Sequence, residues 1–380
     1  MKTTANIFLT LMLLWLSACA SESFEPDVPD TPGTKGVMEI EIVQQDGEAE
    51  DKMNTIRFLV FKQTSGFPEL ELNELFDIPA VSGAGEASEL RIILEVTRKE
   101  NGDNSKIVVA VVNEPYSLGG IRNFSELEDL TLDFAGFLNE NHTKLAENGK
   151  GLPMTGEIQT NKVYPTEVEA RATPAALVLE RAVARVDVYL RKEAGVTTDL
   201  AYGTNISLHN TYDKEYFIRY KNGTGLFGPV QTVTSGFISQ TWEQSSSPAT
   251  EEKEIPDTED GARLICSFYT PERTCHADQN ADKLAIEINI TSTDGSTRNG
   301  TFILDKFQQG NNPEETIEAI YRNNNYRITG TVEVDRIGME LQVTDWQKAL
   351  DEDYVITPVY ELSISKAEVN LLTITEETVP

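Results

Sequence analysis

Alternation of apolar and polar side chains is the feature that most limits how this chain can fold. In residues 37–44, Met38, Ile40 and Ile42 are separated by glutamates, so the apolar side chains fall on one face of an extended strand. Similar patterns and short apolar runs predict strands at residues 56–60, 90–96, 106–113, 176–190, 263–270, 283–292, 300–307, 325–334 and 338–346. Many short strands separated by turn signals, with few helices, favour β-sandwiches.

Two local signals refine this picture. Asp294-Gly295 between two of the strands is typical of a tight hairpin turn. Ser125 and Glu128 fit a capping box, and the leucines and phenylalanines that follow at helical spacing predict one helix continuing through Leu138.

The amino terminus carries a targeting signal. Lys2 provides a weak positive charge before an apolar run at 7–16. This run is too short to span a bilayer as a helix, so residues 1–18 are interpreted as a secretory signal peptide. Leu16-Ser17-Ala18-Cys19 resembles the lipobox of bacterial lipoproteins. That resemblance implies cleavage before Cys19 and its modification with palmitate or a similar acyl chain, which would anchor the protein to a membrane. Ordinary secretion with a coincidental cysteine is the alternative.

The composition suits an exported protein and excludes several partners. Residues 19–36 are rich in proline, aspartate, glutamate and glycine and predict an acidic, flexible tether. The chain has 62 acidic against 32 basic residues, a formal net charge of −30. Such a surface repels nucleic acids and anionic lipid, so binding to DNA or RNA is excluded.

The chain is long enough for two domains, each with its own core. Along residues 176–190, small alanines give way to larger apolar side chains on one face, as if a strand passes from a tight junction into a fuller core. We therefore expect domains at 37–180 and 181–346, followed by a tail at 347–380. The alternative is one ordinary strand within a single domain.

No group of residues predicts catalysis. His142, His209 and His276 lie in unrelated contexts, and none has a second ligand at metal spacing. The sequence has no nucleophile elbow and no phosphate-binding loop, so we expect no enzyme activity, cofactor or metal. Cys266 and Cys275 are either paired in one local disulfide or two unpaired core thiols.

Several segments together resemble fimbrillins, the subunits of type V pili, over residues 1 to 346. After the lipobox and tether, the segments that carry this resemblance follow in the same order: NTIRFLVF (54–61), KIVVAVVN (106–113), GLPMTGE (151–157), LERAVARVDVYL (179–190), YRNNNYRITG (321–330) and the strand ending in Trp346. The resemblance implies two transthyretin-like Greek-key β-sandwich domains and export as a lipoprotein to the cell outer membrane and surface. It also implies assembly with other fimbrial subunits into an adhesive fimbria that contacts host or bacterial surface ligands.

The resemblance further implies strand exchange. In fimbrillins a maturation protease cuts after the first strand, and a terminal strand of a neighbouring subunit fills the groove that opens. Here Met38, Ile40 and Ile42 would be the placeholder residues of the first strand. The donor candidates in the tail are Tyr360, Leu362 and Ile364, and a second candidate segment is 369–375. For residues 37–44 the alternative is a permanent edge strand.

The cleavage site departs from the fimbrillin pattern. Fimbrillins are typically cut after arginine, but the first arginine of this chain is Arg57, which lies within an expected strand. The preceding loop offers only Lys52. Either a lysine-directed or a less specific protease acts, with Lys52 and Arg57 as the candidate sites, or the chain stays uncut and lipid-anchored at the base of the fimbria.

A surface lipoprotein that binds glycans without polymerising is a second interpretation. Glycan-binding surfaces favour exposed aromatic side chains, yet only Trp242 and Trp346 remain after the signal peptide is removed. The tyrosines at 202, 212, 216 and 220 could compensate, although they suit strand and core positions better.

Overall fold

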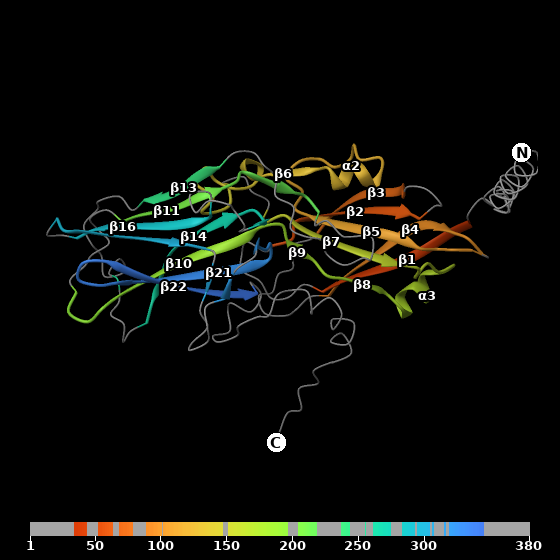
Figure 1. Ribbon diagram of the computed structural model, residues 1–380. Coiled ribbons are helices and arrows are strands. Elements are labelled where there is room, and N and C mark those ends of the chain that lie inside the picture. Colours follow the sequence, from red (N-terminus) through yellow and green to blue (C-terminus); the bar gives the residue numbers. More distant parts are fainter. Residues whose placement is uncertain are drawn as a thin grey trace, which may run out of the picture.

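The protein is mainly β, with two β-sandwiches arranged along an elongated molecule (Figure 1). The first half of the chain forms one sandwich and the second half forms the other. The computed structural model describes residues 34–43, 52–63, 68–78, 89–100, 102–146, 151–196, 204–218, 237–243, 255, 261–274, 283–292, 295–304, 306–307, 315–316 and 319–345. The prediction of a mainly β fold built from β-sandwiches is confirmed.

The N-terminal sandwich packs a sheet of order β4-β1-β8 on a sheet of order β3-β2-β5-β7-β9. Its strands are β1 (Thr34–Val43), β2 (Thr55–Lys62), β3 (Glu69–Asp77), β4 (Glu89–Arg98), β5 (Lys106–Val112), β7 (Met154–Thr160), β8 (Ala175–Leu177) and β9 (Glu180–Arg181). β5 is apolar on both faces because both are covered. Val108 and Ala110 face the sandwich core, and Val109 and Val111 face a second apolar cluster.

The C-terminal sandwich packs a sheet of order β14-β10-β21-β22 on one of order β13-β11-β16-β17. Its strands are β10 (Ala184–Lys192), β11 (Thr204–Thr211), β13 (Ile238–Glu243), β14 (Arg263–Thr270), β16 (Ala285–Thr291), β17 (Thr297–Ile303), β21 (Asn324–Val332) and β22 (Ile337–Asp345). β16 and β17 form the expected hairpin, in which Gly295 adopts a φ of 81° that favours glycine. Smaller strands complete the chain: β6 (Thr131–Asp133), β12 (Lys214–Tyr216), β15 (Arg273–Thr274), β18 (Lys306–Phe307), β19 (Glu315–Thr316) and β20 (Ala319–Ile320).

The predicted helix is wrong in both its cap and its length. Helix α2 covers only Phe124–Glu128, and its cap is Asn123, whose side chain accepts a hydrogen bond from the Glu126 backbone N–H at 2.9 Å. The chain then forms β6 and a 3-10 turn at Phe134–Gly136. The leucines and phenylalanines that had helical spacing are all drawn to one apolar cluster, but from a helix, a strand and a turn.

The segment 176–190 is three strands rather than one. β8 pairs with β1, β9 pairs with β7, and β10 pairs with β14 and β21 in the other sandwich. The chain therefore changes sandwich between Arg181 and Ala184, and the domain limits expected at 37–180 and 181–346 stay a prediction.

Strand β1 begins at Thr34, so the last three residues of the tether expected at 19–36 belong to a strand.

A shared apolar cluster joins the two sandwiches. The outer face of the five-stranded sheet packs against Phe217, Ile218 and Tyr269 from the second half of the chain. β6 and β12 also pair across this junction in an antiparallel ladder. The backbone N–H of Tyr269 donates to the carbonyl of His142 at 2.7 Å.

His142 makes this junction sensitive to pH. Its side chain is 5% exposed beside Phe134, and burial lowers its pKa to about 4, although the carboxylates of Asp213 and Asp133 act in the opposite direction. The unfolded chain, with a histidine pKa near 6.5, binds the proton first, so stability should fall as pH drops from about 6.5 towards 4. At pH 4.5 we expect His142 to account for a loss of about 2 kcal/mol in the free energy of unfolding.

Denaturant unfolding at pH 7 and pH 4.5 measures this loss. The matched variant is His142→Asn, because asparagine tolerates the positive φ of 50° at this position and does not titrate. The aspartate and glutamate side chains contribute equally to the pH dependence of the native chain and of the variant. Identical pH dependence of the native chain and the variant would contradict the assignment.

Candidate functional site

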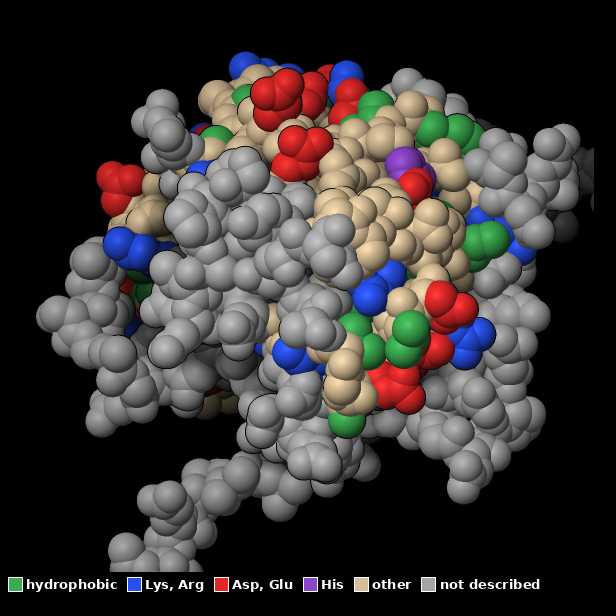
Figure 2. Space-filling model, turned by 90° about the vertical axis from the view of Figure 1, so that its left-hand side faces the viewer, with side chains coloured by type: hydrophobic (Ala, Val, Ile, Leu, Met, Phe, Trp, Pro, Cys, Tyr) green, Lys and Arg blue, Asp and Glu red, His purple; other side chains and the backbone are tan. Residues whose placement is uncertain are grey.

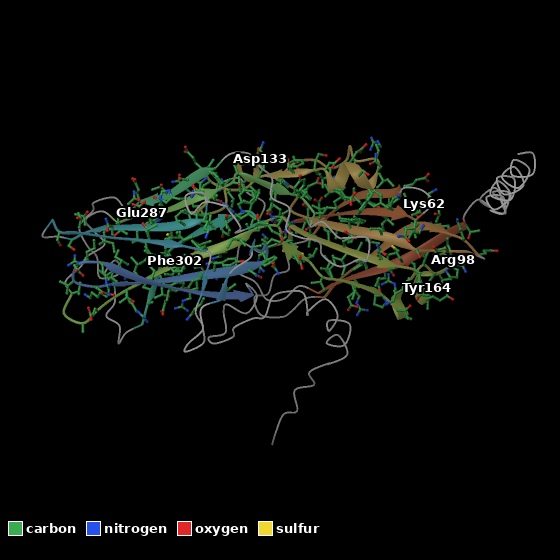
Figure 3. All side chains as sticks on the ribbon, in the orientation of Figure 1. Lys62, Arg98, Asp133, Tyr164, Glu287 and Phe302 are labelled. Carbon is green, nitrogen blue, oxygen red and sulfur yellow. The ribbon has the colours of Figure 1, made fainter. Side chains whose placement is uncertain are left out.

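The first strand lies in the middle of a sheet, not at its edge. β1 pairs antiparallel with β4 over its whole length, from Thr34 opposite Arg98 to Val43 opposite Glu89. On its other side Ile40 to Ile42 run parallel to β8, and Val37 exchanges two backbone hydrogen bonds of 2.8 Å with Tyr164. Figure 3 labels Arg98 and Tyr164, the neighbours of β1, in the N-terminal sandwich on the right of the view. The alternative of a permanent edge strand is therefore wrong about position.

The inward face of β1 fills the core of the N-terminal sandwich. Met38, Ile40 and Ile42 have no exposed surface and lie in one cluster with Phe58 and Val108 of the opposite sheet. Full burial of side chains of this size contributes about 1.5–3 kcal/mol each. If β1 left, the strip between β4 and β8 would expose both unpaired backbone groups and an apolar floor.

The outward face of β1 lies beneath helix α3 (Glu167–Ala172). Glu39 is only 2% exposed there, and its Oε1 lies 3.8 Å from Nη1 of Arg171 on that helix. Its other oxygen, Oε2, has no hydrogen-bond partner. Glu41, one pleat further along, pairs with Arg91 of β4 at 2.9 Å. Two arginines therefore face the two glutamates of β1.

Glycine is required at the third residue of β1. A Cβ atom on Gly36 would lie 2.6 Å from Cβ of Arg98 and 2.8 Å from Cγ1 of Val163. Both distances are shorter than any real carbon contact, so a larger residue could not occupy this place without moving β1 away from its neighbours.

Lys52 combines an exposed side chain with a restrained backbone. Its carbonyl accepts a hydrogen bond of 2.8 Å from Nδ2 of Asn113, and the next residue, Met53, is buried in the core. Residues 44–51, which link Lys52 to β1, lie outside the described residues. A protease could reach the lysine side chain, but the bond after it would have to separate from Asn113 before being cut.

Arg57 is inaccessible in the folded chain. Its guanidinium makes two hydrogen bonds with the Glu114 carboxylate, at 2.6 and 2.9 Å, and a third with Asn73 at 2.7 Å. Arg57 and Glu114 are both buried. Of the two cleavage candidates, the structure therefore leaves only Lys52 within reach of a protease.

The structure does not describe most of the remaining predicted site residues. Cys19, Tyr360, Leu362, Ile364 and the segment 369–375 lie outside the described residues. Cys266 is buried in the core of the C-terminal sandwich with a free thiol, whose pKa burial raises, and Cys275 also lies outside the described part. The disulfide gains no support and stays a prediction.

Sequence reasoning missed Arg171 and the helix that carries it. A capping box was present: Thr166 Oγ1 accepts from the Glu169 backbone N–H at 3.4 Å and donates to Oε2 of the same residue at 2.8 Å. It predicts a helix start at this place, but not that the helix covers β1.

Within the described residues there is no group of three histidine, cysteine or acidic side chains that could hold a metal, and no helix is long and apolar enough to cross a membrane. Figure 2 shows the end of the molecule formed by the C-terminal sandwich, where acidic and basic side chains are interspersed. Among the large exposed apolar residues of the described part, Phe237 is the single aromatic.

The fold is that of solved fimbrial proteins. The tip fimbrial protein Mfa3 from Porphyromonas gingivalis, solved with a C-terminal truncation, matches with a TM-score of 0.50 and 16% identity, over 82% of this chain and 100% of that one. A fimbrilin (FimA) from Porphyromonas gingivalis W83 matches with a TM-score of 0.51 and 15% identity, over 81% of this chain and 97% of that one. No protein-family model and no curated protein matches the sequence. At such identities the likeness shows the fold, and at that level it confirms the resemblance seen in the sequence.

Proposed function

We propose that this chain is a structural subunit of a cell-surface fimbria and that it assembles by exchanging β1 for a strand of a neighbouring subunit. The observation that carries this proposal is the place of β1. It fills the core with Met38, Ile40 and Ile42 and pairs on both sides, yet it is the first strand of the described chain. A strand from another molecule could therefore replace it pleat for pleat.

The shared fold of solved fimbrial proteins supports this proposal. The function is structural, so no catalytic group or cofactor is required. Its partners are other copies or other fimbrial subunits, and the finished fibre contacts surface ligands of host or bacterial cells.

Export as a lipoprotein belongs to the same proposal. Acylation of Cys19 would hold the precursor at the outer membrane until its first strand is released. A cut after Lys52 would remove lipid, tether and β1 together. An uncut chain would instead remain as the anchor of the fibre. Amino-terminal sequencing of the assembled subunit distinguishes a start at Met53 from a lipid-modified Cys19.

The glycan-binding alternative has less support. Trp242 is partly buried against the C-terminal core, and Tyr212 is buried. Among the described residues these side chains form no exposed aromatic platform on which a sugar ring could stack.

A disulfide between β1 and β4 should block assembly. Glu41 and Arg91 are directly opposite, so their Cα atoms lie about 4.5–5.5 Å apart, a separation that suits a disulfide. In the variant Glu41→Cys/Arg91→Cys, oxidation should keep β1 in place even after the loop is cut. We expect SDS-resistant oligomer ladders to disappear in the oxidised protein and to return after reduction.

The matched control crosslinks two strands that do not move. Lys62 and Glu69 are also opposite, on β2 and β3, and form a comparable surface ion pair at 2.8 Å. Lys62→Cys/Glu69→Cys should polymerise whether oxidised or reduced. Normal ladders from the Glu41→Cys/Arg91→Cys variant, with its disulfide verified by mass spectrometry, would reject strand exchange.

A further inference from the structure

Glu39 is the more buried of the two outward glutamates of β1. Its carboxylate is almost fully buried under α3, with one oxygen unpaired and the other 3.8 Å from Arg171. Burial of a charged group is costly unless an opposite charge compensates it. Arg171 is itself 59% exposed, and it also lies 3.5 Å from Glu167 of its own helix. Any strand that replaces β1 meets the same arginine.

The C-terminal tail contains a close copy of the β1 sequence. Residues 37–42 read VMEIEI and residues 359–364 read VYELSI. Aligned in the same direction, the two segments share valine, glutamate and isoleucine at the first, third and sixth places. The apolar residues fall on one face in both segments, and Glu361 takes the place of Glu39.

We infer that Arg171 selects the incoming strand, its register and its direction by pairing with a carboxylate at the place of Glu39, and that Glu361 of a neighbouring subunit supplies that carboxylate. This inference rests on the strand exchange proposed above. It assigns to Arg171 a role in specificity rather than in the stability of the isolated subunit.

Direction follows from both faces of the strand. In the direction of β1, Tyr360 replaces Met38, both being long and unbranched at Cβ, while Ile364 replaces Ile42. In the reverse direction Tyr360 would replace Ile42, which has no exposed surface, and would overpack the core. The reverse direction would also put a serine, not a carboxylate, beside Arg171.

The need for a carboxylate beside Arg171 also distinguishes the two candidate donor segments. The segment 369–375 reads VNLLTIT and contains no acidic residue in any register. It would leave Arg171 without a carboxylate at the place of Glu39. The copy at 359–364 is therefore the donor.

The alignment also sets where pairing begins. Pro358 would fall on Gly36, where any Cβ lies 2.6 Å from Cβ of Arg98. Val359 falls on Val37, whose backbone N–H and carbonyl both bond to Tyr164. The paired strand should therefore begin at Val359, with Pro358 immediately before it. Proline is tolerated at this position because it lies at the end of a strand.

Charge reversal tests this inference in cells that make the full chain as their only subunit. Arg171→Glu and Glu361→Arg should each reduce SDS-resistant oligomers at least tenfold, and the double variant should restore them to at least half of the native amount. Arg91→Glu is the control for direction, because Arg91 would face residue 361 only if the donor ran in reverse. Glu361→Arg should not rescue it.

Folding is followed by the thermal unfolding of each monomer. The substitution Arg171→Glu could destabilise the monomer, because two carboxylates would then repel each other beside β1. If it does, the same tests are repeated in a chain that also carries Glu39→Gln, which removes this repulsion. Rescue of Arg91→Glu instead of Arg171→Glu would overturn the direction. Unchanged oligomers in both single variants, in a system where Leu362→Asp or the β1–β4 disulfide stops assembly, would overturn the role of Arg171 and leave strand exchange standing. If Leu362→Asp and the disulfide also have no effect, strand exchange itself fails.

Discussion

Replacing Leu362 with aspartate is expected to give stable monomers that form no fibres. In the aligned donor strand Leu362 takes the place of Ile40, which has no exposed surface at the centre of the N-terminal core. Each junction would then bury a carboxylate without a partner, at a cost of several kcal/mol. The isolated subunit keeps its own β1 in the groove, so its unfolding temperature should not change.

Electron microscopy of fibre length and SDS-resistant ladders measure the loss. The matched control is Ser363→Asp, which adds the same charge one residue further along. Residue 363 takes the place of Glu41, beside Arg91, so this variant should assemble normally. Fibres of native length from Leu362→Asp would move the donor role to 369–375 or to no segment of the tail.

Alternation and short apolar runs located many of the strands, but not β7, β11 or β13. β14 was predicted at its observed limits, and β2, β4, β16 and β21 were placed within a few residues. The sequence analysis also misses β3 at the edge of the five-stranded sheet, where four of residues 69–77 are acidic and all are half-exposed or exposed. Charged side chains on an edge strand discourage pairing with other chains, and they also hide the strand from a search for apolar faces.

The helix error has a related cause. Leu127, Leu130, Phe134 and Phe137 are spaced as in a helix because all four lie in or against the same apolar cluster. Spacing reports which side chains are buried, but it does not report which backbone buries them. The real cap, Asn123 with Glu126, lies two residues before the predicted one.

The inward half of the candidate site was readable from the sequence, and the outward half was not. The alternation of Met38, Ile40 and Ile42 predicts their burial directly. The contact of Glu39 with Arg171 joins residues far apart in the chain, and it exists because β1 lies between β4 and β8. That placement depends on the parallel pairing of β1 with β8, for which the sequence holds no local signal.

The largest expected effect on stability comes from Arg322, beside the junction between the sandwiches. Its Nε lies 2.7 Å from Oε2 of Glu272, and its two other nitrogens donate to the carbonyls of Phe217 and Tyr216 at 3.1 and 2.7 Å. The arginine is 2% exposed, and Glu215 lies buried on its other side at 3.9 Å. Arg322 thereby fixes the strand β12, which pairs with β6 across the junction.

Arg322→Met should lower the free energy of unfolding by about 3–5 kcal/mol, because it removes a buried cation that lies beside two buried carboxylates. Denaturant unfolding at pH 7 measures the change, and proteolysis should show faster cutting between the two sandwiches, since β12 loses its support. The control is Arg336→Met, which removes a similar contact of 2.6 Å with Glu333 from an arginine that is 71% exposed. That exposed pair competes with water and salt, so its loss should leave the unfolding midpoint unchanged. Equal effects of the two substitutions would show that burial does not decide the strength of these pairs and that the junction is held by its apolar cluster alone.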